Sequence, residues 1–122
     1  IGYVTIATPG NASDFGNSTT AAFYHTCVSD DTYGLSAIGH NVNTIEYVTI
    51  ATPGNASDFG DNSAATYNMA GAANGTYGCF AGAHNFSNVI EYVTIATPGN
   101  ATDFGDLLES LYGAMGSSGN AS

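Results

Sequence analysis

The chain has 122 residues, with ten acidic residues, three histidines and no lysine or arginine, so its formal net charge is −10. Without cationic side chains a protein cannot neutralise phosphates, which excludes nucleic acid as a partner. An anionic membrane surface is excluded in the same way. We also expect no membrane insertion, because no apolar run approaches the length of a span. Disorder is opposed by the hydrophobic fraction of 43%, with eight tyrosines and six phenylalanines.

One motif, YVTIATPGNA(S/T)DFG, dominates the sequence. It occurs at 3–16, 47–60 and 92–105, and the copies differ only at position 102, which is threonine. The residue numbers give spacings of 44 and then 45 residues, which define a tandem repeat. We therefore divide the chain into repeat 1 (1–44), repeat 2 (45–89) and an incomplete repeat 3 (90–122).

Each motif predicts a β-hairpin. Its first strand, Tyr-Val-Thr-Ile, consists of β-branched and aromatic residues that suit a packed, pleated surface. Thr-Pro-Gly-Asn follows, and proline before glycine is typical of a type II turn. The chain then returns as a short second strand that ends at the glycine of Asp-Phe-Gly. A helix is the alternative, but the central Pro-Gly and the β-branched run argue against it.

Two further strands are predicted between successive hairpins. The first covers 21–27 and is matched by 64–70 and, more loosely, by 111–115. The second covers 32–39 and is matched by 76–82. Four short strands in about 45 residues is the size of one β-propeller blade. The predicted fold is therefore all-β, with tandem four-stranded, propeller-like units in a partial propeller or in an array completed by other copies.

The repeat resembles known families in two respects. The order of its strands resembles a kelch-type propeller repeat, with Tyr47 and Tyr92 at the kelch tyrosine and the motif phenylalanines near the kelch tryptophan. The block IEYVTIATPGNATDFGDL at 90–107 resembles tandem repeats of tailed-phage and environmental structural proteins. The chain departs from the kelch pattern because it has no tryptophan and no intact Gly-Gly doublet. The resemblance implies a β-rich structural protein.

The motif aromatic residues are predicted to pack successive repeats together, since aromatic residues at a fixed period usually form packing between units. They are Tyr3, Phe15, Tyr47, Phe59, Tyr92 and Phe104. A tyrosine ring could also bind a sugar or a partner protein.

Seven Asn-x-Ser/Thr sequons are candidate glycosylation sites: Asn11, Asn17, Asn55, Asn74, Asn85, Asn100 and Asn120. Three of them, Asn11, Asn55 and Asn100, close the Pro-Gly turn, where a glycan would be exposed. Asn, Ser and Thr are also common turn residues, so composition alone can produce the motif. A secreted eukaryotic filament would favour glycans, and a phage or bacterial protein would favour unmodified turns.

The acidic pairs Asp58/Asp61 and Asp103/Asp106 are expected to be solvated turn carboxylates. Each pair could supply two oxygen ligands, whereas calcium needs about six to eight, so we expect no cofactor, with calcium as the alternative. His40 and His84 occupy equivalent positions and are interpreted as loop residues, as is His25, because no zinc-ligand spacing is present.

Cys27 and Cys79 are expected to be buried free thiols, and a disulfide between the two is the alternative. No nucleophile elbow is present, and a repeated unit encodes no unique pocket, so we expect no enzyme activity.

The function predicted from these features is that of a non-enzymatic structural repeat protein of a virion appendage or an extracellular filament, located outside the cell or on the virion surface. Its partners would be other copies of itself, with a role in attachment to a glycan or cell-surface receptor. Unpaired strand edges would drive this self-association. The alternative is a glycan- or protein-binding propeller module that uses the loops 29–31, 41–43 and 73–75.

Overall fold

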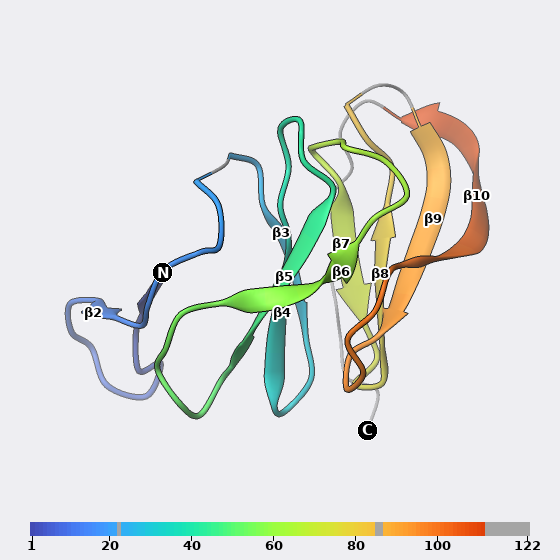
Figure 1. The fold of residues 1–122 in the computed structure, drawn as a ribbon. Helices are drawn as coiled ribbons and strands as arrows, with labels where there is room; N and C mark the ends of the chain where they lie inside the picture. Colours follow the sequence, from blue (N-terminus) through green and yellow to red (C-terminus); the bar gives the residue numbers. More distant parts are fainter. Residues whose placement is uncertain (22, 85–86, 112–122) are drawn as a thin grey trace.

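The computed structural model describes residues 1–21, 23–84 and 87–111. These residues form ten strands and no helix, in three antiparallel sheets of two, four and four strands (Figure 1). The all-β prediction is therefore confirmed. Within the same residues there is no helix of the length and apolar character that crossing a membrane requires.

Every sheet pairs strands that follow one another in the chain. The first sheet is a hairpin of β1 (Gly2–Tyr3) and β2 (Ser13–Asp14). The second sheet contains β3 (Thr26–Ser29), β4 (Tyr33–Ala37), β5 (Thr44–Thr49) and β6 (Ser57–Asp61). The third contains β7 (Ala70–Ala73), β8 (Tyr77–Ala81), β9 (Ser87–Thr94) and β10 (Thr102–Leu111). The hairpin of each motif thus forms β1–β2, β5–β6 or β9–β10.

The β3–β4 and β7–β8 turns are closed by equivalent side chains. In the first turn the Asp30 carboxylate accepts hydrogen bonds from the N–H groups of Thr32 and Tyr33, at 2.7 and 2.6 Å. In the second turn Asn74 takes the same role and accepts the two equivalent bonds at 3.0 and 2.8 Å. Asp and Asn are favoured in such turns because a short side-chain oxygen reaches the backbone two residues ahead.

The strands predicted at 21–27 and 64–70 begin too early. The observed strands are β3 and β7, which start at Thr26 and Ala70. Tyr24 and Asn68 have φ values of 62° and 60°, and this left-handed conformation cannot continue a strand. The strands predicted at 32–39 and 76–82 are confirmed as β4 and β8. The prediction at 111–115 lies outside the described residues except for Leu111, which ends β10.

The turn of each motif also differs from the prediction. The chain reverses at Thr-x-x-Thr, where the N–H of Thr52 donates to the Thr49 carbonyl at 3.1 Å and that of Thr97 donates to Thr94 at 2.9 Å. Gly54 does not adopt the positive φ that a type II turn at 52–55 would need. The first motif reverses in the same way, with the Thr8 N–H donating to the Thr5 carbonyl at 3.1 Å, although its Gly10 contacts no neighbouring hairpin in the described part of the chain, so this turn is a property of the motif.

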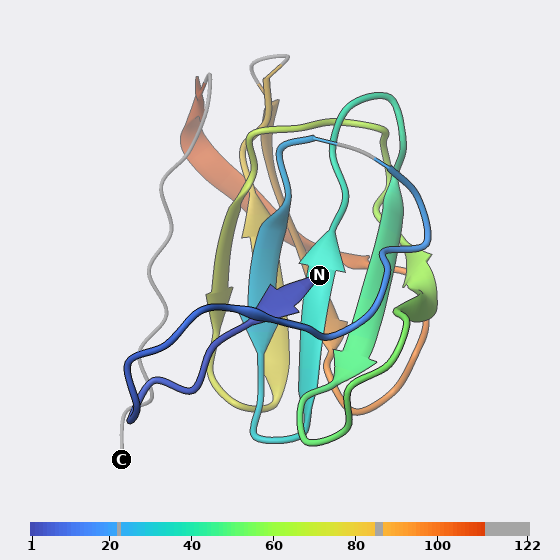
Figure 2. The same ribbon diagram turned by 90° about the vertical axis from the view of Figure 1, so that its left-hand side faces the viewer.

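The three sheets lie in chain order as adjacent layers, with the N-terminal hairpin on one side of the β3–β6 sheet and the β7–β10 sheet on the other (Figures 1 and 2). The core lies between the two four-stranded sheets and is formed by Val28, Leu35, Ala37, Ile45, Phe59, Met69, Phe80, Val93 and Ile95. A Cβ at Gly78 would lie 2.6 Å from Val28 Cγ2, so a glycine there allows the two sheets to approach closely.

Candidate functional site

The strongest candidate site is the contact between consecutive motifs, which we call the joint. It brings the Pro-Gly-Asn-Ala segment of one motif against the residue that follows Asp-Phe-Gly in the preceding motif. In the first joint, Asn55 Oδ1 accepts a hydrogen bond from the N–H of Asn17 at 2.9 Å. The N–H of Ala56 donates to the Asn17 carbonyl, also at 2.9 Å. Both backbone groups of Asn17 are thus hydrogen-bonded to the following motif.

The second joint repeats this pattern. Asn100 Oδ1 accepts from the N–H of Asp61 at 3.1 Å, and the N–H of Ala101 donates to the Asp61 carbonyl at 2.8 Å. Because the same bonds form at both positions, they are a property of the motif. The sequence signal for them was the invariant Asn of the turn, which we had interpreted as a turn residue and sequon.

A glycine is required on the receiving side of each joint. Gly16 and Gly60 have φ values of +149° and +151°. A Cβ at Gly16 would overlap the Gly54 carbonyl group, and one at Gly60 would overlap that of Gly99. The glycine of Asp-Phe-Gly is therefore the residue that lets the next motif pack against the strand.

A buried glutamate completes each joint. Glu46 accepts hydrogen bonds from Ser18 Oγ at 2.5 Å, from the N–H of Thr19 at 2.7 Å and from Thr19 Oγ1 at 2.9 Å. Glu91 accepts from the N–H of Ser63 at 2.8 Å. In a protein without lysine or arginine, these donors take the place of a cation in compensating a buried carboxylate. Sequence reasoning placed the acidic residues on solvated surfaces and missed both glutamates.

The six motif aromatics form one T-shaped pair in each motif. The ring centroids are 5.8 Å apart in Tyr3–Phe15, 5.9 Å in Tyr47–Phe59 and 5.9 Å in Tyr92–Phe104. Phe59 lies in the core with 3% of its surface exposed, whereas Phe104 is 66% exposed. The role of these six residues in packing successive repeats stays a prediction.

The molecule has two open apolar faces, one beyond each end of the stack of sheets. The β1 face carries Val4 and Ile6, and Ile6 is 98% exposed although its counterpart Ile95 is 1% exposed. The β10 face carries Tyr92 and Phe104.

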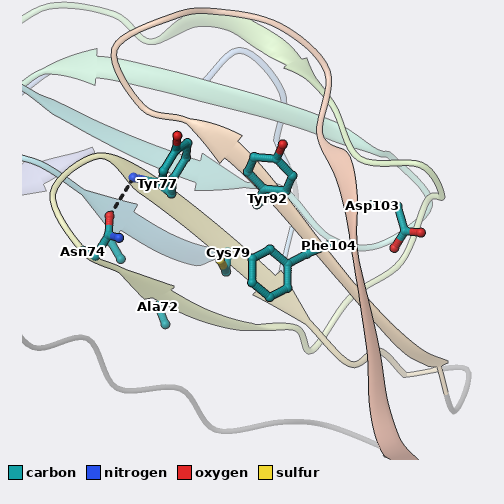
Figure 3. A pocket seen from close by; sticks show the side chains of 8 residues that line it. Ala72, Asn74, Tyr77, Cys79, Tyr92, Asp103 and Phe104 are labelled. Atoms are coloured by element: carbon teal, nitrogen blue, oxygen red, sulfur yellow. Dashed lines mark hydrogen bonds between the residues drawn. The ribbon is translucent and has the colours of Figure 1, made fainter.

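The β10 face borders a groove of about 540 Å³ (Figure 3). Ala72, Cys79, Tyr92 and Phe104 line this groove. In the β3–β6 sheet the counterpart of Cys79 is Leu35, which is buried in the core. The groove therefore exposes Cys79, whereas the β7–β10 sheet covers the equivalent residue of the β3–β6 sheet.

The candidate glycosylation sites have different environments. Asn11, Asn17, Asn55, Asn74 and Asn100 are exposed, whereas Asn85 and Asn120 lie outside the described residues. Asn55 and Asn100 use their side-chain oxygen in a joint, and Asn74 uses it in the β7–β8 turn.

No three His, Cys, Asp or Glu residues gather into a metal-binding group within residues 1–21, 23–84 and 87–111. Asp103 Oδ1 instead accepts from the N–H of Gly105 at 3.0 Å, as Asp14 Oδ1 does from Gly16 at 3.1 Å. Calcium binding by the acidic pairs stays untested.

The two cysteines are free thiols, but the prediction that both are buried was wrong. Cys27 is exposed and Cys79 is partly buried. Successive residues of a strand point to opposite faces of its sheet, so Cys27 lies on the face opposite to the core residue Val28. Burial raises the pKa of the Cys79 thiol, because desolvation disfavours the thiolate.

An aromatic cluster that sequence reasoning missed is formed by residues that precede β3 and β7 and residues that follow β4 and β8. The Tyr67 ring stacks on Tyr24 at 5.1 Å and on His84 at 4.0 Å, with His40 tilted at 5.8 Å. Phe23 lies 6.0 Å from His40. The sequence signal for this cluster was that His40 and His84 occupy equivalent positions in the repeat. His25, the third histidine, lies apart, with Nδ1 2.9 Å from Ser36 Oγ.

No protein-family model matches the chain, and a search of curated proteins finds no significant match. A kelch-like or phage-type repeat therefore stays a hypothesis that rests on the motif.

Proposed function

We propose that this protein is a non-enzymatic structural repeat protein that associates with further copies of itself, as part of a virion appendage or an extracellular filament. Its four-stranded sheets would act as propeller-like blades. The observation that carries the proposal is the pair of open faces, because side chains that are buried inside the molecule are exposed at each end. Ile95 and Phe59 are buried and Ile50 is 45% exposed, whereas Ile6 is 98% exposed and Phe104 is 66% exposed.

Burial of these faces would provide the free energy for association. Covering one large apolar side chain contributes about 1.5–3 kcal/mol, and both faces carry several. β10 is also an edge strand, and an edge presents unpaired backbone groups to another chain. The net charge of −10 opposes association, so assembly should strengthen as salt screens the repulsion.

Sedimentation velocity over a concentration series tests the proposal. Association should increase between about 0.01 M and about 1 M salt, over which the Debye length falls from about 30 to about 3 Å. Ile6→Glu and Phe104→Glu should each weaken it by placing a carboxylate where an apolar contact is expected. The matched control is Phe23→Glu, because Phe23 is 69% exposed but lies on neither face. A wild-type protein that stays monomeric throughout would contradict self-association.

A second candidate function, recognition of a glycan, is favoured by the aromatic cluster. Phe23 and Tyr24 are exposed and lie beside Tyr67 and two histidines, and exposed aromatic rings can stack on a sugar. The double substitution Phe23→Ala/Tyr24→Ala should then abolish binding on a glycan array while self-association is retained. Equal glycan binding by wild type and variant would reject this candidate.

A further inference from the structure

We propose that two chains join head to tail through a third joint, in which the β10 face of one chain receives the β1 face of the next. Asn11 Oδ1 of one chain would accept a hydrogen bond from the Asp106 N–H of the other, and the Ala12 N–H would donate to the Asp106 carbonyl. This inference rests on the proposed self-association and specifies its partner, its register and its residues.

The Pro-Gly-Asn-Ala side of this joint is present and open in the first motif. Asn11 occupies the position of Asn55 and Asn100, both of which accept a backbone N–H from the preceding motif. The Asn11 side chain itself is exposed and has no hydrogen-bond partner within the part of the chain that the structure describes. Within residues 1–21, 23–84 and 87–111, no atom lies within 4 Å of a Cβ placed at Gly10.

The receiving side is present and open in the third motif. Asp106 occupies the position of Asn17 and Asp61 and lies on the edge strand β10, opposite Val89. Val89 uses its own peptide groups elsewhere, because its N–H donates to Ser87 Oγ and its carbonyl accepts from Gly82, both at 3.2 Å. In an antiparallel pair of this kind the edge residue directs its N–H and carbonyl away from the sheet. Both Asp106 groups therefore point outward.

The glycine of the third motif is already in the receiving conformation. Gly105 has a φ of +143°, close to the +149° and +151° of Gly16 and Gly60. At those two positions a carbonyl of the following motif fills the space of the missing side chain, whereas none of the described residues has an atom within 4 Å of a Cβ placed at Gly105. Gly105 thus has the backbone conformation of the glycine in a formed joint, although no described residue packs against it.

Two departures from the repeat fall on opposite sides of this third joint. The position of Glu46 and Glu91 is occupied by Gly2 in the first motif. The hydrogen-bonding residues Ser18 and Thr19 have Leu107 and Leu108 as their counterparts in the third motif.

A glutamate placed against Leu107 and Leu108 would lack the hydroxyl donors that Glu46 has and would keep at most a backbone N–H, as Glu91 has from Ser63, so its burial would be less well compensated. The third motif lacks these hydroxyl donors, and the first motif, which would face it in the third joint, lacks the glutamate. This match favours another copy of the same chain as the occupant of the β10 face, and it gives a heterologous contact that can propagate.

The first test compares Gly105→Ala with Gly75→Ala by sedimentation velocity. Both glycines have positive φ, but Gly75 (φ 85°) lies in the β7–β8 turn and not on the strand β10 that carries the proposed receiving site. Gly105→Ala should weaken association at least about tenfold, since the Cβ would occupy the place of the incoming carbonyl. Gly75→Ala should leave it unchanged. Equal association of Gly105→Ala and wild type would overturn the inference and leave self-association standing.

A second pair of variants removes one hydrogen bond. Asn11→Ala should weaken association by about fivefold, as expected for loss of one neutral hydrogen bond. Asn17→Ala is the matched control, since the structure shows Asn17 joined to Asn55 and Ala56 through its backbone. A loss of association that is equal in the two variants would contradict the register.

A mixing experiment tests the polarity of the contact. Ile6→Glu keeps an intact β10 face and Phe104→Glu keeps an intact β1 face, so each variant alone should be monomeric and an equimolar mixture should form a pair. If wild type associates but the mixture stays monomeric, head-to-tail joining is wrong while self-association holds. If wild type does not associate at all, both proposals fail.

Discussion

Phe59 and Phe104 are the same residue of the same motif in different surroundings. Each makes a T-shaped contact with its own tyrosine at 5.9 Å, yet Phe59 is 3% exposed and Phe104 is 66% exposed. The difference arises because the β7–β10 sheet packs on the β3–β6 sheet, while no described sheet follows β7–β10 (Figure 1). Local sequence sets the ring pair, and the neighbouring sheet decides its burial.

The burial of Ile95 and Ile6 also depends on a neighbouring sheet, but in this case on the sheet that precedes the motif. Ile95 packs back toward the β3–β6 sheet and is buried, whereas Ile6 lies in the first hairpin and is exposed. The second motif lies between these extremes, because its isoleucine, Ile50, is 45% exposed. The two open faces therefore differ in the side chains that they expose, with Val4 and Ile6 on one and Phe104 on the other.

The largest expected effect separates Phe59 from Phe104. Phe59→Ala should lower the free energy of unfolding by about 3–5 kcal/mol, because it leaves a cavity in the core. Phe104→Ala should change it by less than about 0.5 kcal/mol in dilute monomer, as for other exposed sites. Urea denaturation followed by circular dichroism measures both values. Similar costs for the two substitutions would contradict the assignment of Phe59 to the core.

A second contrast separates the receiving glycines. Gly60→Ala and Gly105→Ala share the cost of a positive φ, but only the first places a Cβ against the Gly99 carbonyl. Gly60→Ala should therefore be about 1–3 kcal/mol more destabilising, which is the usual cost of overpacking. Thermal and urea unfolding of the two variants at the same low protein concentration measures the difference. Equal stability would mean that the joint can open to admit a side chain.

A third contrast concerns the buried glutamates. Glu46 accepts three hydrogen bonds and Glu91 accepts one, so Glu46→Gln should cost roughly 1 kcal/mol more than Glu91→Gln. The amide keeps the shape of the carboxylate but replaces one accepting oxygen with a donor. Chemical denaturation near neutral pH checks this order. If Glu91→Gln proved the more harmful, the joint between the hairpin and the β3–β6 sheet would be the weaker one.

The smallest effect is a difference in thiol reactivity. Cys27 is exposed, whereas burial raises the pKa of Cys79, so less of Cys79 is thiolate at any pH below that pKa. Cys27 should be alkylated first at pH 8, and the lag of Cys79 should shrink as the pH rises toward its own pKa. Timed iodoacetamide labelling with peptide mass spectrometry follows both sites. Faster labelling of Cys79 would contradict its partial burial.

The sequence was sufficient to predict strands where the local signal and the tertiary environment agreed. Val48 and Ile50 flank the end of β5 as β-branched residues should, and Pro53 correctly excluded a helix. The starts of β3 and β7 were missed, because no local rule requires Tyr24 and Asn68 to adopt positive φ. The turn was expected at Pro-Gly because that pair favours a type II turn, whereas all three motifs reverse at Thr-x-x-Thr.

By itself, the amino-acid sequence determined the all-β class and the motif period, since these depend on side-chain type and spacing along the chain. Only the tertiary structure decided that Asn55 and Asn100 hold consecutive motifs together and that Glu46 and Glu91 are buried. It also decided that the glycines of Asp-Phe-Gly receive a carbonyl. The physical reason is that hydrogen bonding and burial depend on which groups from distant parts of the chain come together, and identical motifs acquire different environments once they are stacked in order.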